Sequence, residues 1–150
     1  MIRVEIGDPR HPQATALLQE SHQLMQDLFP AESNHYLSID DLCTTDITFL
    51  TAMTDGEIIG TGALADKGDY GEVKSMFVAT SARGTGTAGA ILRMIEDIAR
   101  EKGHTYLRLE TGDKLDAAHR LYERHGFTQR GPFGDYPDDP LSLFMEKLLK

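Results

Sequence analysis

The chain has 150 residues, a formal net charge of −9 at pH 7 and a single cysteine, Cys43. The length suits one domain, residues 1–150, around one hydrophobic core. The lone cysteine excludes an internal disulfide and any metal site built from several thiolates, and the acidic balance disfavours nonspecific binding to nucleic acid. No apolar run reaches the ~20 residues of a membrane span, and the N-terminus lacks the apolar core of a signal peptide, so we expect a cytoplasmic protein with no membrane partner.

A short strand and a long helix are expected at the start of the chain. Residues 2–6 alternate between apolar and polar side chains, which predicts a strand. Asp8 offers a helix cap, and Pro9 is the residue type best suited to a first helical position. Apolar residues then recur at helical spacing until Pro30, which predicts a helix of about five turns. The segment 38–41 has the spacing of a capping box and predicts a second, short helix.

Three consecutive strands follow these helices. Asp55 and Gly56 both tolerate positive φ, so they predict a tight hairpin between strands over residues 47–54 and 57–65. A turn leads to a third strand over residues 70–79. The three strands are expected to form an antiparallel meander.

The second half of the chain alternates between strands and helices. The strand-helix-strand unit that begins at residue 70 should form a parallel, right-handed crossover. The fold class is therefore α/β (α+β), with a mixed, mostly antiparallel central sheet flanked by helices. In order, we expect a glycine-rich turn over residues 81–90, a helix ending at Gly103, a strand over 105–110, a helix over 114–125, and strands over 127–130 and 141–149.

The glycine-rich turn is typical of a phosphate-binding loop. Two glycines let the backbone come close to a ligand, and the first free N–H groups of the following helix point at that ligand. Residues 84–89 also match the G-x-G-x-x-G pattern of dinucleotide-binding folds. However, this loop follows three antiparallel strands, and residues 79–83 lie between the apolar run that ends at Val78 and the first glycine. Only about sixty residues remain after the loop, and these features disfavour a dinucleotide fold.

A second frame of the same loop, Arg83-Gly84-Thr85-Gly86-Thr87-Ala88, fits the pattern Q/R-x-x-G-x-G/A. About thirty residues later the segment 118–127 fits A-x-x-L-Y-x-x-x-G-F. With both motifs in this order, most of the chain resembles the GCN5-related N-acetyltransferase (GNAT) superfamily. Two departures are Leu115, where many members carry an Asn that contacts the pantetheine arm, and Thr87, where Ile or Val is commoner.

The resemblance implies the GNAT acyl-CoA N-acyltransferase fold, acetyl-coenzyme A as cosubstrate, and direct acetyl transfer in a ternary complex. The acceptor would be the primary amine of a small molecule, an amino acid, a peptide or a protein lysine. Superfamily members are often homodimers. The alternatives are a coenzyme-A-binding regulatory module without catalytic activity and, more distantly, a dinucleotide-binding protein.

The resemblance also assigns the cofactor site. The strand before the loop is expected to splay from the strand after the helix, which would leave backbone groups of Met76, Phe77 and Val78 free for the pantetheine and for an oxyanion. The pyrophosphate of coenzyme A would lie on the backbone N–H groups of Arg83, Gly84, Thr85, Gly86, Thr87, Ala88 and Gly89.

Two residues are nominated for the chemistry. An amine acceptor with a pKa near 10.4 is mostly charged at neutral pH, so a general base is useful. Glu72 lies where histone-acetylating relatives place their glutamate base, and it is expected to share a strand face with Lys74 and Met76; the alternative is an ion-paired carboxylate. Tyr122 lies where many relatives have the general acid that protonates the leaving thiolate, and the alternative is a tyrosine packed beside the cofactor.

The acceptor site is the least determined part of the sequence. The resemblance places it between the first two helices and the C-terminal strands, and an amine-bearing acceptor is the expected partner. The six histidines show no metal-binding spacing, so we predict no metal. The nominated acceptor residues are His35, Tyr36, Glu110, Asp135 and Tyr136.

Overall fold

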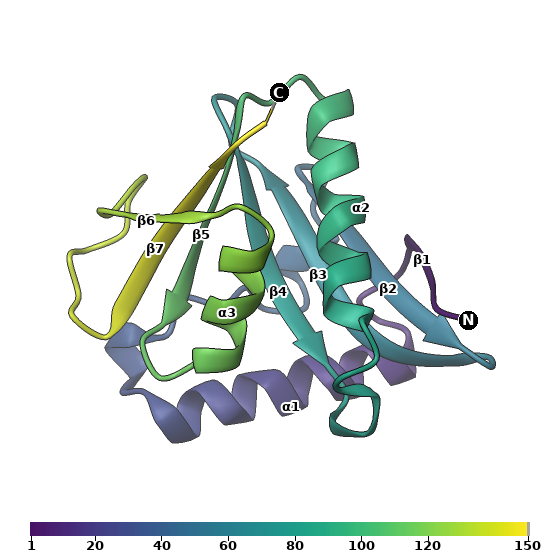
Figure 1. Ribbon diagram of the computed structural model, residues 1–150. Coiled ribbons are helices and arrows are strands. Elements are labelled where there is room, and N and C mark those ends of the chain that lie inside the picture. The colour runs from purple at the N-terminus through teal and green to yellow at the C-terminus, as the bar shows by residue number, and fades with distance from the viewer. Residues whose placement is uncertain (150) are drawn as a thin grey trace.

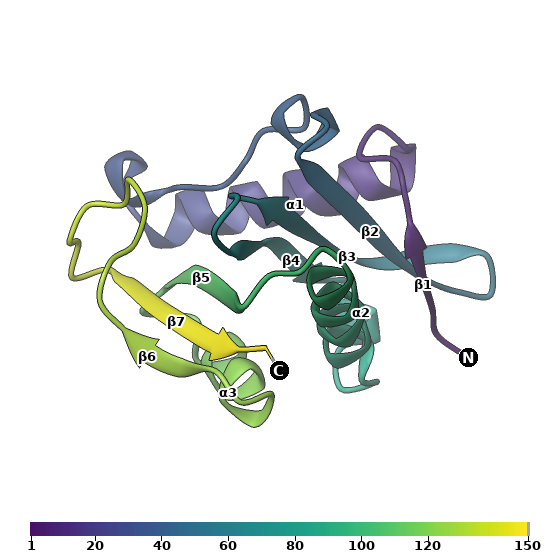
Figure 2. The ribbon, with the colours of Figure 1, turned by 90° about the horizontal axis from the view of Figure 1, so that it is seen from above.

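One sheet organises the computed structural model, which describes residues 1–149. Its seven strands lie in the order β1-β2-β3-β4-β5-β7-β6, with α1 on one face and α2 and α3 on the other (Figures 1 and 2). Only β4 and β5 pair in parallel. The elements are β1 (Arg3–Ile6), α1 (Pro12–Leu28), β2 (Ile47–Thr54), β3 (Glu57–Asp66), β4 (Gly71–Val78), α2 (Thr87–Glu101), β5 (Tyr106–Gly112), α3 (Asp116–Arg124), β6 (Thr128–Arg130) and β7 (Ser142–Leu148).

The predicted fold class and element order are confirmed. The hairpin between β2 and β3 turns at Asp55 (φ 50°) and Gly56 (φ 80°), as the two turn residues require. The strand-helix-strand unit from β4 through α2 to β5 is parallel, as expected.

The predicted start of the first helix is wrong by three residues. α1 begins at Pro12, and the imidazole of His11 accepts a hydrogen bond from the backbone N–H of Gln13 at 3.2 Å. Asp8 instead accepts a hydrogen bond from the N–H of Arg10 in a preceding turn, at 2.9 Å. A helix begun at Pro9 would contain Pro12 in its first turns, where proline has no N–H to donate and its ring clashes with the preceding turn. The later proline therefore sets the helix start.

The predicted capping box forms, but it opens only a single turn. The N–H of Asp41 donates to Ser38 Oγ at 3.1 Å, and the N–H of Ser38 donates to the carboxylate of Asp41 at 3.4 Å. The 3-10 helix that follows spans Asp41–Cys43. The reciprocal bonds fix the chain direction before β2.

Two hydrophobic clusters hold the helices against the sheet. Each fully buried Leu or Ile contributes about 1.5–3 kcal/mol relative to an exposed one. Gly62 lets α2 pack close to β3, since a Cβ at this position would overlap the side chain of Ile91. The cluster under α2 and α3 includes Leu50, Leu64, Ile91, Leu92, Ile95, Leu107 and Leu109, and the smaller one under α1 includes Ala14, Leu18, Leu42, Phe49 and Ala63.

β4 and β5 separate soon after they meet, which opens the centre of the sheet. They pair only at Gly71 with Leu107 and at Glu72 with Arg108. Beyond these pairs the two ribbons diverge (Figure 1). The expected splay of these strands is confirmed, and it leaves one edge of β4 without a strand partner.

A bulge in β4 changes which side chains share a face. Ser75 has φ 56°, and the register with β3 shifts there. The extra residue moves Met76 to the face covered by α2, where it packs against the larger core cluster. The expectation that Met76 shares a face with Glu72 and Lys74 is therefore wrong, because simple alternation along a strand fails at a bulge.

Candidate active site

The glycine loop presents backbone N–H groups at the start of α2. Gly84 (φ 79°) and Gly86 (φ 85°) have left-handed backbone conformations, and Gly86 caps the helix. The first helical hydrogen bond runs from the N–H of Ala90 to the carbonyl of Gly86 at 3.0 Å. The N–H groups over residues 87–89 therefore lack helical partners, and they lie at the positive end of the helix dipole. This geometry suits an anion such as a phosphate.

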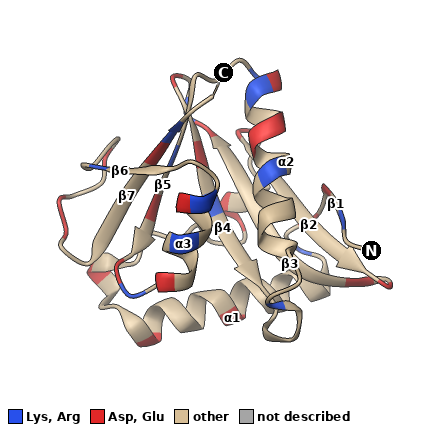
Figure 3. Cartoon of the chain, in the orientation of Figure 1, with Lys and Arg blue, Asp and Glu red and all other residues tan. Residues whose placement is uncertain are grey.

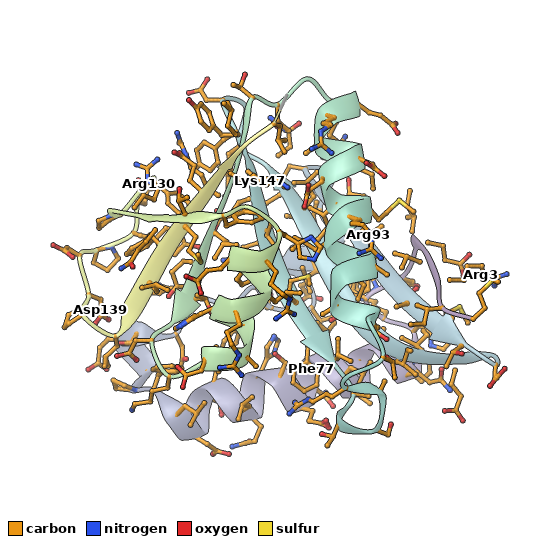
Figure 4. The ribbon with its side chains drawn as sticks, viewed as in Figure 1. Arg3, Phe77, Arg93, Arg130, Asp139 and Lys147 are labelled. Atoms are coloured by element: carbon orange, nitrogen blue, oxygen red, sulfur yellow. The ribbon has the colours of Figure 1, made fainter. Side chains whose placement is uncertain are left out.

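Side chains hold the loop in place. Thr85 Oγ1 donates to the carbonyl of Ala82 at 2.5 Å and lies 2.7 Å from Thr87 Oγ1. Thr87 is buried, so this hydroxyl pair satisfies its polar atom. The guanidinium of Arg83 lies 6.0 Å from the ring centre of Phe77, which sits at the end of β4 beside the loop (Figure 4). The loop is thus anchored to the strand that leads into it.

A cavity of about 130 Å³ lies where β4 and β5 diverge. α1, the segment after it and α3 supply its remaining walls. Its lining residues are Ser21, Met25, Phe29, Ser33, Asn34, His35, Tyr36, Val73, Lys74, Ser75, Met76, Glu110, Thr111, Gly112, Leu115, Ala118 and Tyr122.

Glu110 and Tyr122 both line the cavity, and both have a raised pKa. Burial raises the pKa of Glu110, although Ser142 Oγ donates a hydrogen bond to its carboxylate at 2.8 Å. Burial also raises the pKa of the Tyr122 phenol, and the charge of Glu110 adds to this rise. The phenol of Tyr122 therefore stays protonated at neutral pH, and Glu110 ionises at a higher pH than an exposed glutamate.

Glu72, the base predicted from the sequence, lies behind the cavity wall. Its side chain is 3% exposed and does not line the cavity. Its carboxylate accepts a hydrogen bond from the hydroxyl of Tyr136, and Lys74 Nζ lies 3.6 Å away. This contact pattern resembles the ion-paired alternative more closely than a base facing an acceptor.

Lys74 joins three separate parts of the chain. Its Nζ donates to the hydroxyl of Tyr136 at 2.8 Å and to the carbonyl of His35 at 3.0 Å. Ser33 Oγ donates to Asp139 at 2.5 Å. Hydrogen bonds therefore tie the segment after α1 and the loop before β7 to β4 and to each other.

The cavity brings together part of the predicted site. Tyr136 does not line the cavity and instead contacts Lys74 and Glu72. Asp135 also does not line the cavity and is exposed to solvent. Phe77, Val78 and the glycine loop lie beyond the lining, toward the start of α2. The roles of all these residues stay predictions. The predicted residues that line the cavity are His35, Tyr36, Met76, Glu110 and Tyr122.

Sequence reasoning missed several lining residues. Lys74 had a weak signal, since it follows Glu72 at strand spacing. Ser75 had none, because its bulged conformation arises from pairing with β3. Ser33 and Asn34 are held at the cavity by hydrogen bonds, from Ser33 to Asp139 in the loop before β7 and from Asn34 to the carbonyl of Phe29 at the end of α1.

Charge is spread over the surface of the molecule. Acidic and basic residues alternate along α2 and α3, and further Asp and Glu residues are scattered over loops and strands (Figure 3). Within residues 1–149 no three His, Cys, Asp or Glu side chains gather in a way that would hold a metal ion. In the same range no helix combines the length and apolarity needed to cross a membrane.

Comparisons with known proteins agree with this architecture. The Acetyltransferase (GNAT) family matches residues 15–127. The chain is 47% identical over 143 residues to the IAA acetyltransferase of Azospirillum brasilense, covering 94% of each chain. It is 36% identical over 151 residues to an uncharacterized N-acetyltransferase, YsnE, of Bacillus subtilis, covering 99% of this chain and 100% of that one.

Solved structures share the fold over the whole chain. An acyl-CoA N-acyltransferase from Klebsiella pneumoniae has a TM-score of 0.84 at 30% identity, covering 100% of this chain and 99% of that one. The PaiA N-acetyltransferase of Thermoplasma acidophilum, in complex with coenzyme A, has a TM-score of 0.77 at 17% identity, covering 99% of each chain. These comparisons confirm the GNAT fold. At the level of the family they also confirm acetyl-coenzyme A as the cosubstrate. The chain belongs to the GNAT acetyltransferase family.

Proposed function

We propose that this protein is an N-acetyltransferase that moves an acetyl group from acetyl-coenzyme A to a primary amine held in the cavity, by direct transfer in a ternary complex. The observation that carries the proposal is that Glu110 and Tyr122 line the same cavity, where β4 and β5 separate, and interact electrostatically. The family match and the acetyltransferase names of the relatives support the reaction class.

The chain offers groups that fit coenzyme A. The free N–H groups over residues 87–89 and the open glycine turn suit the pyrophosphate, and Arg83 adds a cation beside them. The β4 edge over residues 76–78, which has no strand partner toward β5, offers backbone groups to the pantetheine arm. Acetyl-coenzyme A supplies an acetyl group as a reactive thioester.

Glu110 is the group best placed to accept the amine proton. A base works best when its pKa is close to the working pH, and burial moves the pKa of Glu110 in that direction. Glu72 stays the base predicted from sequence. Its contacts with Tyr136 and Lys74, and its position off the cavity, favour Glu110 for direct contact with the acceptor.

Tyr122 is placed to return a proton. Burial raises the pKa of its phenol, which keeps the proton in place at neutral pH and makes the phenol a weaker acid, so the proton moves only as negative charge develops on the departing sulfur. Glu110 takes the proton of the amine as the new C–N bond forms, and Tyr122 protonates the sulfur as the C–S bond breaks. The proton on Glu110 then replaces the one that Tyr122 lost, by way of solvent, which restores both groups. The balance is one N-acetylated amine and one free thiol.

The test measures free thiol released from acetyl-coenzyme A with a panel of amines. The proposal expects amine-dependent release, and a melting temperature that rises with coenzyme A but not with NAD. A rise in melting temperature without release for any amine would instead identify a coenzyme-A-binding regulatory module. No rise with coenzyme A would reject both.

Paired variants separate the two carboxylates. Glu110→Gln is expected to lower kcat about 10²- to 10⁴-fold and to remove the acidic limb of the pH profile. Glu72→Gln is expected to destabilise the fold while keeping that limb. The reverse pattern would assign the base to Glu72.

A further inference from the structure

Two ionisable side chains of opposite charge line the cavity. Lys74 contributes an ammonium from β4 and Glu110 a carboxyl from β5. The charge of Glu110 acts on the Tyr122 phenol, and the charges of His35 and Lys74 act on Glu110. Lys74 lies at the end formed by the segment after α1, because it donates to the carbonyl of His35. The cavity therefore has a carboxyl within electrostatic reach of Tyr122 and a cation at the end formed by the segment after α1, and within residues 1–149 these two groups form no ion pair with each other.

The cationic end has hydrogen-bonding capacity to spare. His35 Nε2 and Ser75 Oγ are both buried, and neither has a hydrogen-bond partner within residues 1–149. Both residues line the cavity. Unsatisfied buried polar atoms are rare in native proteins, and a pair of them in one cavity indicates a missing polar partner.

Lys74 adds to this capacity. Two of its three N–H donors are used, on the hydroxyl of Tyr136 at 2.8 Å and on the carbonyl of His35 at 3.0 Å. Glu72 lies 3.6 Å from Nζ, beyond hydrogen-bond distance, and its carboxylate is engaged by Tyr136. One ammonium N–H is thus left for a ligand.

The conformation of Ser75 supports a binding role. It is one of two non-glycine residues within 1–149 that have positive φ, and the other is in the hairpin turn. Backbone strain of this kind inside a strand gathers at ligand sites. The bulge brings Ser75 to the cavity beside Lys74, although neighbours in a regular strand face opposite ways.

We propose that the acceptor is a small amino carboxylate, whose carboxylate binds the donors of Lys74, His35 and Ser75 and whose amine meets Glu110. An ionised carboxylate only accepts hydrogen bonds, and these three groups are all able to donate them. The identification rests on the proposed acetyltransferase function, since it names the acceptor of that same site.

Other acceptor classes fit the cavity less well. A polyamine would bring a second cation to the end that Lys74 occupies, and like charges in a poorly solvated site repel. A lysine in a protein would carry a peptide backbone rather than a carboxylate near its amine. The cavity volume of about 130 Å³ also suits a small molecule.

The experiment compares matched acceptors. Thiol release from acetyl-coenzyme A is measured with alanine, alaninamide and ethylamine, with phenylalanine, phenylalaninamide and phenethylamine, and with β-alanine, spermidine and a lysine peptide. Loss of a charge-assisted contact in a cavity is expected to lower kcat/KM about tenfold or more, so at least one amino carboxylate should exceed its amide and its decarboxylated amine by this factor.

Variants assign the preference to the proposed residues. Lys74→Met and His35→Phe should each shrink the ratio of kcat/KM for the carboxylate to that for its amide. Lys67→Met, which removes an exposed cation from the turn before β4, is the charge-matched control and should keep the ratio. Because Lys74 is part of a buried network, Lys74→Arg provides a second variant that retains the cation and should retain the preference.

The outcomes separate this inference from the proposed function. Equal kcat/KM for a carboxylate and its amide, or transfer only to spermidine or the lysine peptide, would overturn the amino carboxylate while leaving the acetyltransferase intact. A preference for carboxylates that survives both Lys74→Met and His35→Phe would overturn the assigned site. An absence of transfer to every amine would reject the proposed function, and the acceptor class with it.

Discussion

Tyr136 donates a hydrogen bond to Glu72 across 64 residues of chain. The same hydroxyl accepts a hydrogen bond from Lys74, so one phenol bridges a buried carboxylate and a partly buried ammonium. This bridge fixes the loop before β7 over the open end of the sheet. It also explains why the carboxylate nominated from sequence as a base is engaged within the protein.

Tyr136→Phe is expected to lower the free energy of unfolding by about 1–3 kcal/mol near pH 7, because it leaves two buried polar partners without their shared hydroxyl. Burial and the neighbouring Glu72 raise the pKa of Tyr136 above its ordinary value of 10.0. The native state therefore keeps the phenolic proton after the unfolded chain loses it, and the stabilising contribution falls as pH rises above about 10. Urea unfolding at pH 7 and pH 10.5 checks this.

The matched control is Tyr36→Phe. The Tyr36 hydroxyl is at the surface and accepts a hydrogen bond from Gln26 at 2.8 Å. Its removal should change the free energy of unfolding by no more than about 0.5 kcal/mol. Equal effects of the two substitutions would contradict a structural role for the Tyr136 bridge.

Ser142→Ala is expected to move the acidic limb of the kcat/KM profile to higher pH. The hydroxyl of Ser142 donates to the carboxylate of Glu110 and so opposes the rise in its pKa that burial causes. Without this donor the pKa of Glu110 rises further, and the base ionises at a higher pH. Activity on the alkaline plateau should be close to that of the wild type. If the acidic limb of the kcat/KM profile does not move, the ionisation of Glu110 does not determine that limb.

Comparing Gly86→Ala with Gly56→Ala separates a role of the glycine loop in cofactor binding from the effect of backbone strain alone. Gly86 and Gly56 have nearly the same φ, 85° and 80°, and a Cβ at either one meets no atom within 4 Å. Each alanine substitution should lower the free energy of unfolding by about 1–2 kcal/mol through left-handed strain. Only Gly86→Ala should weaken coenzyme A binding, measured by titration calorimetry. Equal binding by both variants would remove the loop from the cofactor site.

Gly112→Ala is expected to damage both stability and the cavity. A Cβ at this position would overlap the ring of Phe29, and both residues line the cavity. We expect a loss of about 1–3 kcal/mol from overpacking and a lower kcat/KM. Gly131→Ala is the control, because a Cβ there meets nothing within 4 Å and φ is not positive. Adding Phe29→Leu to Gly112→Ala should restore part of the stability, as double-mutant analysis would show.

Much of the architecture was determined by sequence alone. The apolar periodicities, the Asp55-Gly56 turn and the two motifs that begin at Arg83 and Ala118 depend on residues close together in the chain. Local patterns of this kind report local structure, and their order limits the topology. The first helix was misplaced because two prolines competed for its start, and only the later one leaves a proline-free interior.

The tertiary structure decided which residues line the candidate site. The bulge at Ser75 comes from pairing with β3, and it moves Met76 to the other face of the sheet. Glu72 is engaged by a residue from a distant loop, whereas Glu110 is left on the cavity wall. Burial and partner choice depend on contacts between segments far apart in sequence. The sequence therefore determined that this chain folds as a GNAT acetyltransferase, and only tertiary packing decided which carboxylate faces the cavity.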